Sequence, residues 1–212
     1  MKNILLIVFI LTAKLIFAQD KKYPFEKWDE QVKKDAATAE NATYIGNKEK
    51  ELVFLINLVR NNPKLYWETY AQKYIDENNI DNNSFLKSLK KELYEAKTVQ
   101  YLIPDVDLQK MSDELALSQE KNGKTGHDKF ADRIEKLPIK FKNSRVAENI
   151  YYGPFEPEHV IMSWLIDEGV NGVEHRKAIL NPRNKFIGIS VKPHKKEKNV
   201  VVMDFANQSY WE

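Results

Sequence analysis

The chain has 212 residues, with 33 lysines and arginines against 31 aspartates and glutamates, for a formal net charge of +2. This length predicts one domain with enough apolar side chains for a core, and so balanced a charge argues against general nucleic-acid binding, which needs concentrated positive charge. The absence of cysteine excludes disulfide bonds, a cysteine nucleophile and a lipid-modified N-terminal cysteine.

Residues 1–18 are predicted to be a signal peptide that is cleaved after Ala18. A positive start at Lys2 precedes an almost wholly apolar stretch, residues 4–18, which ends on a small residue, as signal peptides do. The alternative is a membrane anchor, but Lys14 interrupts this stretch, and a spanning helix needs about 20 apolar residues. We therefore expect a secreted or periplasmic protein, with no transmembrane segment once the signal peptide is removed.

The next part of the chain is predicted to be a short arm followed by two helices. Residues 19–43 are polar and charged, which indicates an N-terminal extension that is at most weakly helical. Helical spacing of apolar residues begins at Asn47 and stops at Pro63. A stripe formed by tyrosines 66, 70 and 74 predicts a second helix that runs to about Ile75.

Two further helices are predicted in the middle of the chain. Residues 85–96 are rich in charged side chains, which is typical of a surface helix. Another helix is expected from Asp107, a good N-cap residue, to about Asn122. Glycines at positions 123 and 126 end it and open a loop that carries His127.

The last third of the chain mixes strands and helices. Residues 144–152 are predicted to be a strand, 156–170 a helix and 175–180 a short helix. Residues 186–191 and 200–205 are rich in β-branched side chains and are joined by a basic loop, the pattern of an antiparallel hairpin. Helices that precede locally paired strands predict an α+β fold.

Glu148 is out of place in its predicted strand. Alternation puts Val146, Glu148 and Ile150 on one apolar face. A buried carboxylate needs a charged or hydrogen-bonding partner, so a structural ion pair with Arg145 or Arg176 is one explanation. The other is that Glu148 lies in a solvated cleft and serves a functional site.

Two histidines and two acids are further candidates. His175 shares the inward face of its helix with residues 178 and 179, where a histidine is either a satisfied core residue or a ligand. Asp167 and Glu168 both border a buried stripe, and periodicity does not choose between them. His127 in its glycine-flanked loop is uninformative alone.

The candidate set suits a small metal site or acid–base chemistry. Neutral imidazoles ligate divalent ions, and carboxylates complete the shell or orient the rings; the same groups transfer protons. The spacing matches no established metal motif, since the sequence has no His-Glu-x-x-His. It also has no Gly-x-Ser-x-Gly nucleophile motif.

Taken together, these segments resemble the CAP superfamily of cysteine-rich secretory proteins, venom allergens and plant pathogenesis-related proteins. Five features occur in the order found in that family: the helix with Asn-Asn-Pro at 55–63, Gly-His at 126–127, Ala-Glu-Asn-Ile at 147–150, the segments 164–170 and 175–182, and Phe-Ile-Gly-Ile at 186–189. No single motif is decisive, but the ordered set is specific. The resemblance implies a domain over residues 44–212.

The resemblance also implies a fold and a site. The fold is an α-β-α sandwich with a central antiparallel sheet. The site is a cleft lined by two histidines and two acids, which in some members holds zinc or another divalent metal. Carried over to this chain, His127 and His175 are the metal ligands, and Glu148 is the first cleft acid. The second acid aligns with Asp167, but the acid type and the spacing depart from the family pattern, which leaves Glu168 open.

Three functions are compatible with these histidines and acids. The first is an extracytoplasmic binding module for a small molecule, a lipid or a protein, which is the usual role in the family. The second is a metal-dependent hydrolase of peptide or ester bonds, with Glu148 as general base and with His127 and His175 as further catalytic candidates. The third is a purely structural polar network. The family places Glu148 between the two histidines, which favours the cleft over the structural ion pair.

Overall fold

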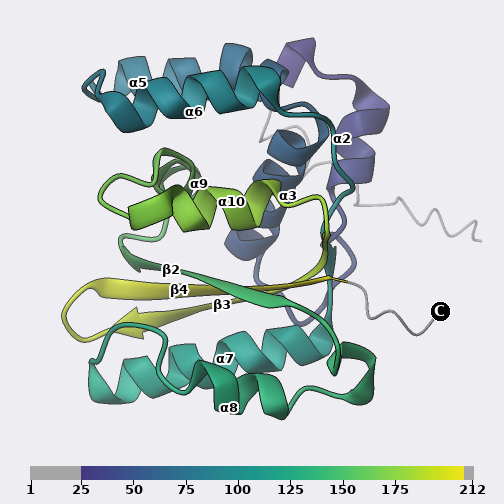
Figure 1. The fold of residues 1–212 in the computed structure, drawn as a ribbon, viewed down its shortest axis with the longest axis vertical. Coiled ribbons are helices and arrows are strands. Elements are labelled where there is room, and N and C mark those ends of the chain that lie inside the picture. The colour runs from purple at the N-terminus through teal and green to yellow at the C-terminus, as the bar shows by residue number, and fades with distance from the viewer. Residues whose placement is uncertain (1–24, 208–212) are drawn as a thin grey trace, which may run out of the picture.

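The computed structural model describes residues 25–207, and its elements form three layers (Figure 1). A four-stranded sheet lies in the middle, with α7 and α8 on one face and helices that include α3, α6, α9 and α10 on the other. This arrangement confirms the α-β-α sandwich expected from the sequence. The signal peptide expected at residues 1–18 lies outside the described residues.

The helical elements are short to medium in length. They are η1 (Phe25–Lys27), α2 (Glu30–Ala36), α3 (Asn47–Asn61), α4 (Pro63–Tyr66), the π-helix η2 (Trp67–Ala71), α5 (Gln72–Glu77), α6 (Ser84–Glu95), α7 (Val106–Asn122), α8 (Phe130–Glu135), η3 (Ile139–Phe141), α9 (Pro157–Ile166), η4 (Asn171–Val173) and α10 (Glu174–Leu180).

The sheet has the order β1-β3-β4-β2. Its strands are β1 (Ile103–Pro104), β2 (Val146–Gly153), β3 (Asn184–His194) and β4 (Lys198–Asn207). β3 and β4 form the predicted antiparallel hairpin, β2 pairs antiparallel to β4, and the two-residue β1 runs parallel to β3. β2 is therefore an outer strand of the sheet, and it is where the candidate residues gather.

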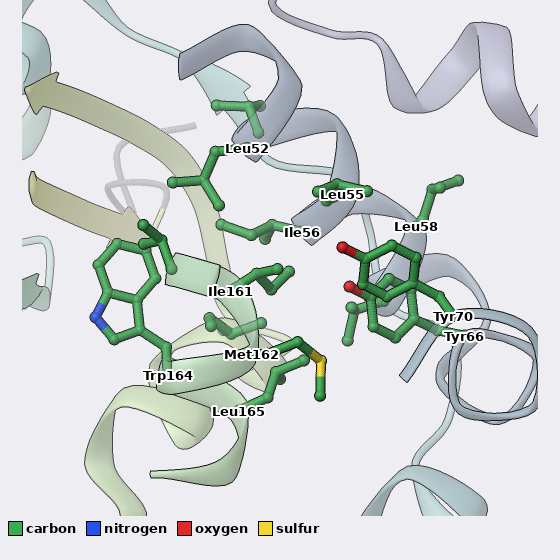
Figure 2. Packing of buried hydrophobic residues seen from close by; sticks show 14 of the residues in the cluster. Leu52, Leu55, Ile56, Leu58, Tyr66, Tyr70, Ile161, Met162, Trp164 and Leu165 are labelled. Carbon is green, nitrogen blue, oxygen red and sulfur yellow. The ribbon is translucent and has the colours of Figure 1, made fainter. Parts of the chain in front are cut away.

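The main core lies between the sheet and the helices α3 and α9. Leu52, Leu55 and Ile56 of α3 face Ile161 and neighbouring apolar residues of α9, and all four of these named side chains are fully buried (Figure 2). Burial of apolar surface stabilises a fold by about 25 cal/mol per Å² removed from water. The contact between α3 and α9 is therefore a major stabilising contact of this fold. The position of α9 in turn fixes the turn that follows it, which carries Asp167.

The described part of the segment 19–43 is packed into this core. Phe25 and Trp28 are each 4% exposed and Ala36 is fully buried. The Trp28 indole Nε1 donates a hydrogen bond to Thr69 Oγ1 at 3.0 Å. The segment is polar in composition, but these apolar side chains point inward, so from Phe25 onward it is an integral part of the helical layer.

Local details differ from the sequence expectations at three places. The N-cap of α7 is Asp105, whose carboxylate accepts from the amides of Asp107 and Leu108. The tyrosine stripe is one continuous helical path, but its middle turn is the π-helix η2. α8 and β1 were not expected, because a six-residue helix and a two-residue strand are too short to show periodicity.

Gly188 of β3 allows α7 to pack directly on the sheet. A Cβ atom at this position would overlap the main chain of Leu108 and Gln109. We therefore expect Gly188→Ala to destabilise the protein by about 1–3 kcal/mol or more, since overpacking forces the backbone to move. Urea denaturation measures the change. An alanine variant as stable as the parent would contradict this close packing.

Candidate functional site

His127 is held by a buried ion pair. Its Nδ1 lies 2.7 Å from Oε1 of Glu148, whose two oxygens also accept from Nη1 and Nη2 of Arg133 at 2.6 and 3.0 Å. The side chains of Glu148 and Arg133 are 1% and 2% exposed, whereas that of His127 is 52% exposed. The carboxylate is therefore an internal support, and the imidazole is the part that meets solvent.

A second set of hydrogen bonds fixes the loop that carries His127. α7 ends at Gly123, which has a left-handed backbone with φ of 65°, a conformation that favours glycine. Gly126 then donates its amide to the Tyr152 hydroxyl at 2.7 Å and accepts from Gln119 Nε2 at 2.7 Å. The Tyr152 hydroxyl donates to Gln119 Oε1 at 2.9 Å. The loop is thus tied to both α7 and β2.

Asp204 brings a second carboxyl group to this buried site. It is the cross-strand partner of Glu148 in the β2–β4 register, is fully buried, and accepts from Ser112 Oγ at 2.8 Å. Burial and the negative charge of Glu148 raise the pKa of Asp204 well above its ordinary value. Burial acts in the same direction on Glu148, but hydrogen bonds from His127 and Arg133 outweigh it and lower the pKa of Glu148.

His175 is held in a similar way by Asp167. Asp167 is the C-cap of α9 and has a left-handed backbone with φ of 58°, which Asp tolerates better than most residues. Its Oδ1 lies 2.7 Å from His175 Nδ1, and its Oδ2 accepts from the amides of His175 and Arg176 at the start of α10. Glu168 is exposed. Of the two acids left open by the sequence, Asp167 is the one in contact with His175.

The two histidine–acid pairs border opposite faces of β2. Glu148 and Asn149 are consecutive strand residues, so their side chains point to opposite faces. Glu148 contacts His127, and Asn149 Nδ2 donates to the main-chain oxygen of His175 at 3.1 Å. Across residues 25–207 no group of three or more histidine and acidic side chains is arranged to hold one metal ion.

The buried partner of Glu148 differs from the sequence expectation. Arg176 binds main-chain oxygens of α9 and the side chains of Ser88 and Glu92. Arg145 is exposed, and its main-chain amide donates to Asn207 Oδ1. Arg133 of α8 takes the place beside Glu148, and its Nε also donates to the main-chain oxygen of Asp128 in the loop that carries His127.

Asp204 is a member of the site that was not found from the sequence. A signal was present in the sequence, because the period of two puts Asp204 on the same strand face as Val200, Val202 and Ala206. An acid on an apolar strand face needs a partner, and the same reasoning identified Glu148 from the sequence.

The fold and the ordered motifs define a class of protein. The model of the family described as CAP, cysteine-rich secretory protein family, matches residues 53–205. This range includes the Gly-His loop after α7 and the acid on the outer strand. The chain belongs to this family.

Three solved structures are similar to this chain, and the first of them supports the fold. The venom allergen-like protein 4 of Schistosoma mansoni aligns with a TM-score of 0.50 at 14% identity, covering 78% of this chain and 91% of that one. An outer surface protein of Borrelia burgdorferi has 23% identity and a TM-score of 0.44, over 61% of this chain and 97% of that one. A cysteine-rich secretory protein of Staphylococcus aureus has 19% identity and a TM-score of 0.41, over 61% and 40%. A comparison with curated protein sequences gives no match.

Proposed function

We propose that the protein is an extracytoplasmic recognition module, and that His127 and His175 make its contacts with a small-molecule, lipid or protein ligand. One observation carries the proposal: each imidazole has its Nδ1 fixed by a buried carboxylate, which leaves Nε2 as the ring nitrogen for a ligand. A ring held in this way is pre-oriented, so it loses little freedom when a ligand binds.

The same arrangement supports a limited form of metal binding. Carboxylates that fix Nδ1 are the usual outer partners of metal-ligating histidines, and the oxygens of Glu148 and Asp167 are already engaged in this role. His127 and His175 would then be the ligands. Zinc sites normally have three or four protein ligands, and no third is in place among residues 25–207. A divalent ion, when bound, would therefore share these imidazoles with donor atoms of the ligand or water.

The alternative of a metal-dependent hydrolase has less support. In that mechanism Glu148 would take a proton from an attacking water. Its carboxylate, however, is 1% exposed and both oxygens are bound by Arg133, which lowers its pKa and weakens it as a base. The orientation of His127 is the role that these contacts favour.

The extracytoplasmic location rests on the sequence of residues 1–18 and on the family. Across residues 25–207, none of the helices has the length and the apolar character required to span a bilayer. N-terminal sequencing of the exported protein tests the location, and a chain that begins at Gln19 is the expected result.

Zinc binding tests the role of the histidines. We expect His127→Ala and His175→Ala each to weaken zinc affinity tenfold or more, as measured by calorimetry, because removal of a ligand costs at least as much as loss of an outer partner. Affinity should also fall on acidification, since ligation requires neutral imidazole.

A matched control is available in His159, which is half-buried and bonded through Nδ1 to Tyr74. His159→Ala should leave zinc affinity unchanged. If the double variant of His127 and His175 binds zinc as well as the parent, these residues are not a metal site.

A further inference from the structure

A cluster of five lysines lies at one end of the molecule, at the α7 C-terminus and the β3–β4 turn. Both segments lie at the left end of the structure in Figure 1. All five residues are exposed, and none forms an ion pair within residues 25–207. We call this the lysine cluster, and its members are Lys121, Lys124, Lys195, Lys196 and Lys198.

The two segments of the lysine cluster are joined by a buried histidine. His194 is 5% exposed, and its Nδ1 accepts from the amides of Lys196 and Glu197. Nδ1 must then be unprotonated, so Nε2 carries the hydrogen and donates to the main-chain oxygen of Lys124 at 3.1 Å. The turn and the loop after α7 are therefore held side by side.

A direct contact between two members strengthens this link. The Lys195 ammonium donates to the main-chain oxygen of Lys121 in the last turn of α7, where a positive charge is favourable because of the helix dipole. The side chain of Lys195 also lies next to Gly123, where an added Cβ would meet it at 3.5 Å. The positive charges are thus brought together by the fold.

The charge balance of the lysine cluster is strongly positive. Residues 120–124 and 194–198 contain these five lysines and two acids, Glu120 and Glu197, so five positive charges face two negative ones. Elsewhere many lysines are paired with acids, as Lys136 is with Glu114 and as Lys140 is with two aspartates at the start of α7. In a chain whose total charge is close to zero, an unpaired group of this size marks a surface for an anionic partner.

We propose that the lysine cluster docks the protein on an anionic phospholipid surface. Clusters of four to eight lysines and arginines held at a membrane surface attract anionic lipids electrostatically, and the lysine cluster has a comparable number of charges. The five lysines lie at the end of α7 and in the loop after it, and in the β3–β4 turn and the first residue of β4. These segments are at one end of the molecule (Figure 1), which suits a broad, flat partner. Because Gly126 and His127 follow Lys124 within three residues, docking would bring the candidate site close to the lipid headgroups.

This inference goes beyond the proposed function and does not depend on it. Zinc binding by the histidines and lipid binding by the lysines involve different residues, so either result stands if the other fails. The lysine variants should therefore keep the zinc affinity of the parent.

Vesicle sedimentation tests the proposal. At low salt the parent should bind phosphatidylcholine vesicles that contain phosphatidylglycerol, but not pure phosphatidylcholine vesicles. Each lysine near such a surface contributes about fivefold in affinity. The variant Lys124→Gln/Lys195→Gln/Lys196→Gln should therefore bind on the order of 100-fold more weakly, and high salt should abolish the binding of the parent.

A matched control comes from the opposite side of the fold. Lys87, Lys91 and Lys97 are exposed and lie on or just after α6, on the far side of the sheet from α7 (Figure 1). Their triple glutamine variant should bind as the parent does. Equal binding by the cluster variant, equal binding to neutral vesicles, or binding to soluble polyphosphate without binding to vesicles would each overturn the proposal, provided that thermal unfolding shows both variants to be folded.

Discussion

Glu148→Gln should lower the free energy of unfolding by about 3–5 kcal/mol in metal-free protein at neutral pH. The change removes the negative charge that faces Arg133, and a buried charge without its partner costs this much. The guanidinium cannot be rehydrated in place, since the Arg133 side chain is 2% exposed. Urea denaturation at pH 7 measures the loss, and Glu156→Gln is its control. Glu156 forms an exposed ion pair with Lys48, so that variant should change by no more than about 1 kcal/mol.

The pH dependence gives this prediction a second test. The pKa of Glu148 is lowered in the folded protein by His127 and Arg133, against the effect of burial. The contribution of this carboxylate is therefore present above its unfolded pKa of about 4.3 and is lost as the pH falls through the lower folded value. The parent and Glu148→Gln should converge in stability on acidification. A difference that stays constant to about pH 3 would mean that the loss does not come from the charge of this carboxylate. A loss under about 1 kcal/mol at pH 7 would show that Glu148 behaves as a solvated group.

The burial of Glu148 was predictable from the sequence, but its partner was not. Alternation along β2 placed the carboxylate on an apolar face, and the structure confirms this. The family order then favoured the solvated cleft, whereas the structure surrounds the carboxylate with Arg133 and Asp204. Arg133 could not be found by periodicity, because α8 is a single short helix whose position depends on the fold of the preceding loop.

The choice between Asp167 and Glu168 shows a similar limit. Both acids border the buried stripe of α9, so a helical wheel treats them alike. What separates them is the left-handed backbone at Asp167, which ends the helix and turns the carboxylate toward the start of α10. This depends on where α10 packs, which is a tertiary property. The long helices and the hairpin were predictable, because each is long enough to show its own apolar period.

Asp204→Asn should stabilise the protein relative to the parent, and the gain should grow with pH. Among residues 25–207, none donates a hydrogen bond to the buried Oδ1 of Asp204. The negative charge of Glu148 acts on this carboxyl group, so a proton on Asp204 removes a repulsion between two carboxylates. Burial and the charge of Glu148 accordingly raise the pKa of Asp204. Asparagine resembles this protonated acid, since it can donate toward Glu148 and still accept from Ser112.

The sign of the effect follows from proton linkage. A raised folded pKa means that the folded protein holds a proton that the unfolded chain, with an Asp pKa of about 3.9, has already released. The contribution of Asp204 is thus fully present below the unfolded pKa and is lost as the pH rises through the folded pKa, by about 1.4 kcal/mol per pH unit between the two. Asparagine does not titrate, so the stability difference between Asp204→Asn and the parent should rise with this slope from about pH 4 upward.

Two further variants separate this explanation from a simple packing effect. Asp204→Leu fills the same space but cannot donate to Glu148 or accept from Ser112, so it should be less stable than Asp204→Asn at every pH. Ser112→Ala removes one hydrogen bond that favours the charged form, and should raise the pKa of Asp204 and extend the loss of stability to higher pH. Denaturation curves from about pH 4 to 8 measure both effects. A difference between Asp204→Asn and the parent that does not vary over this range would mean that Asp204 is ionised in the folded protein, and that Arg133 alone balances two buried carboxylates.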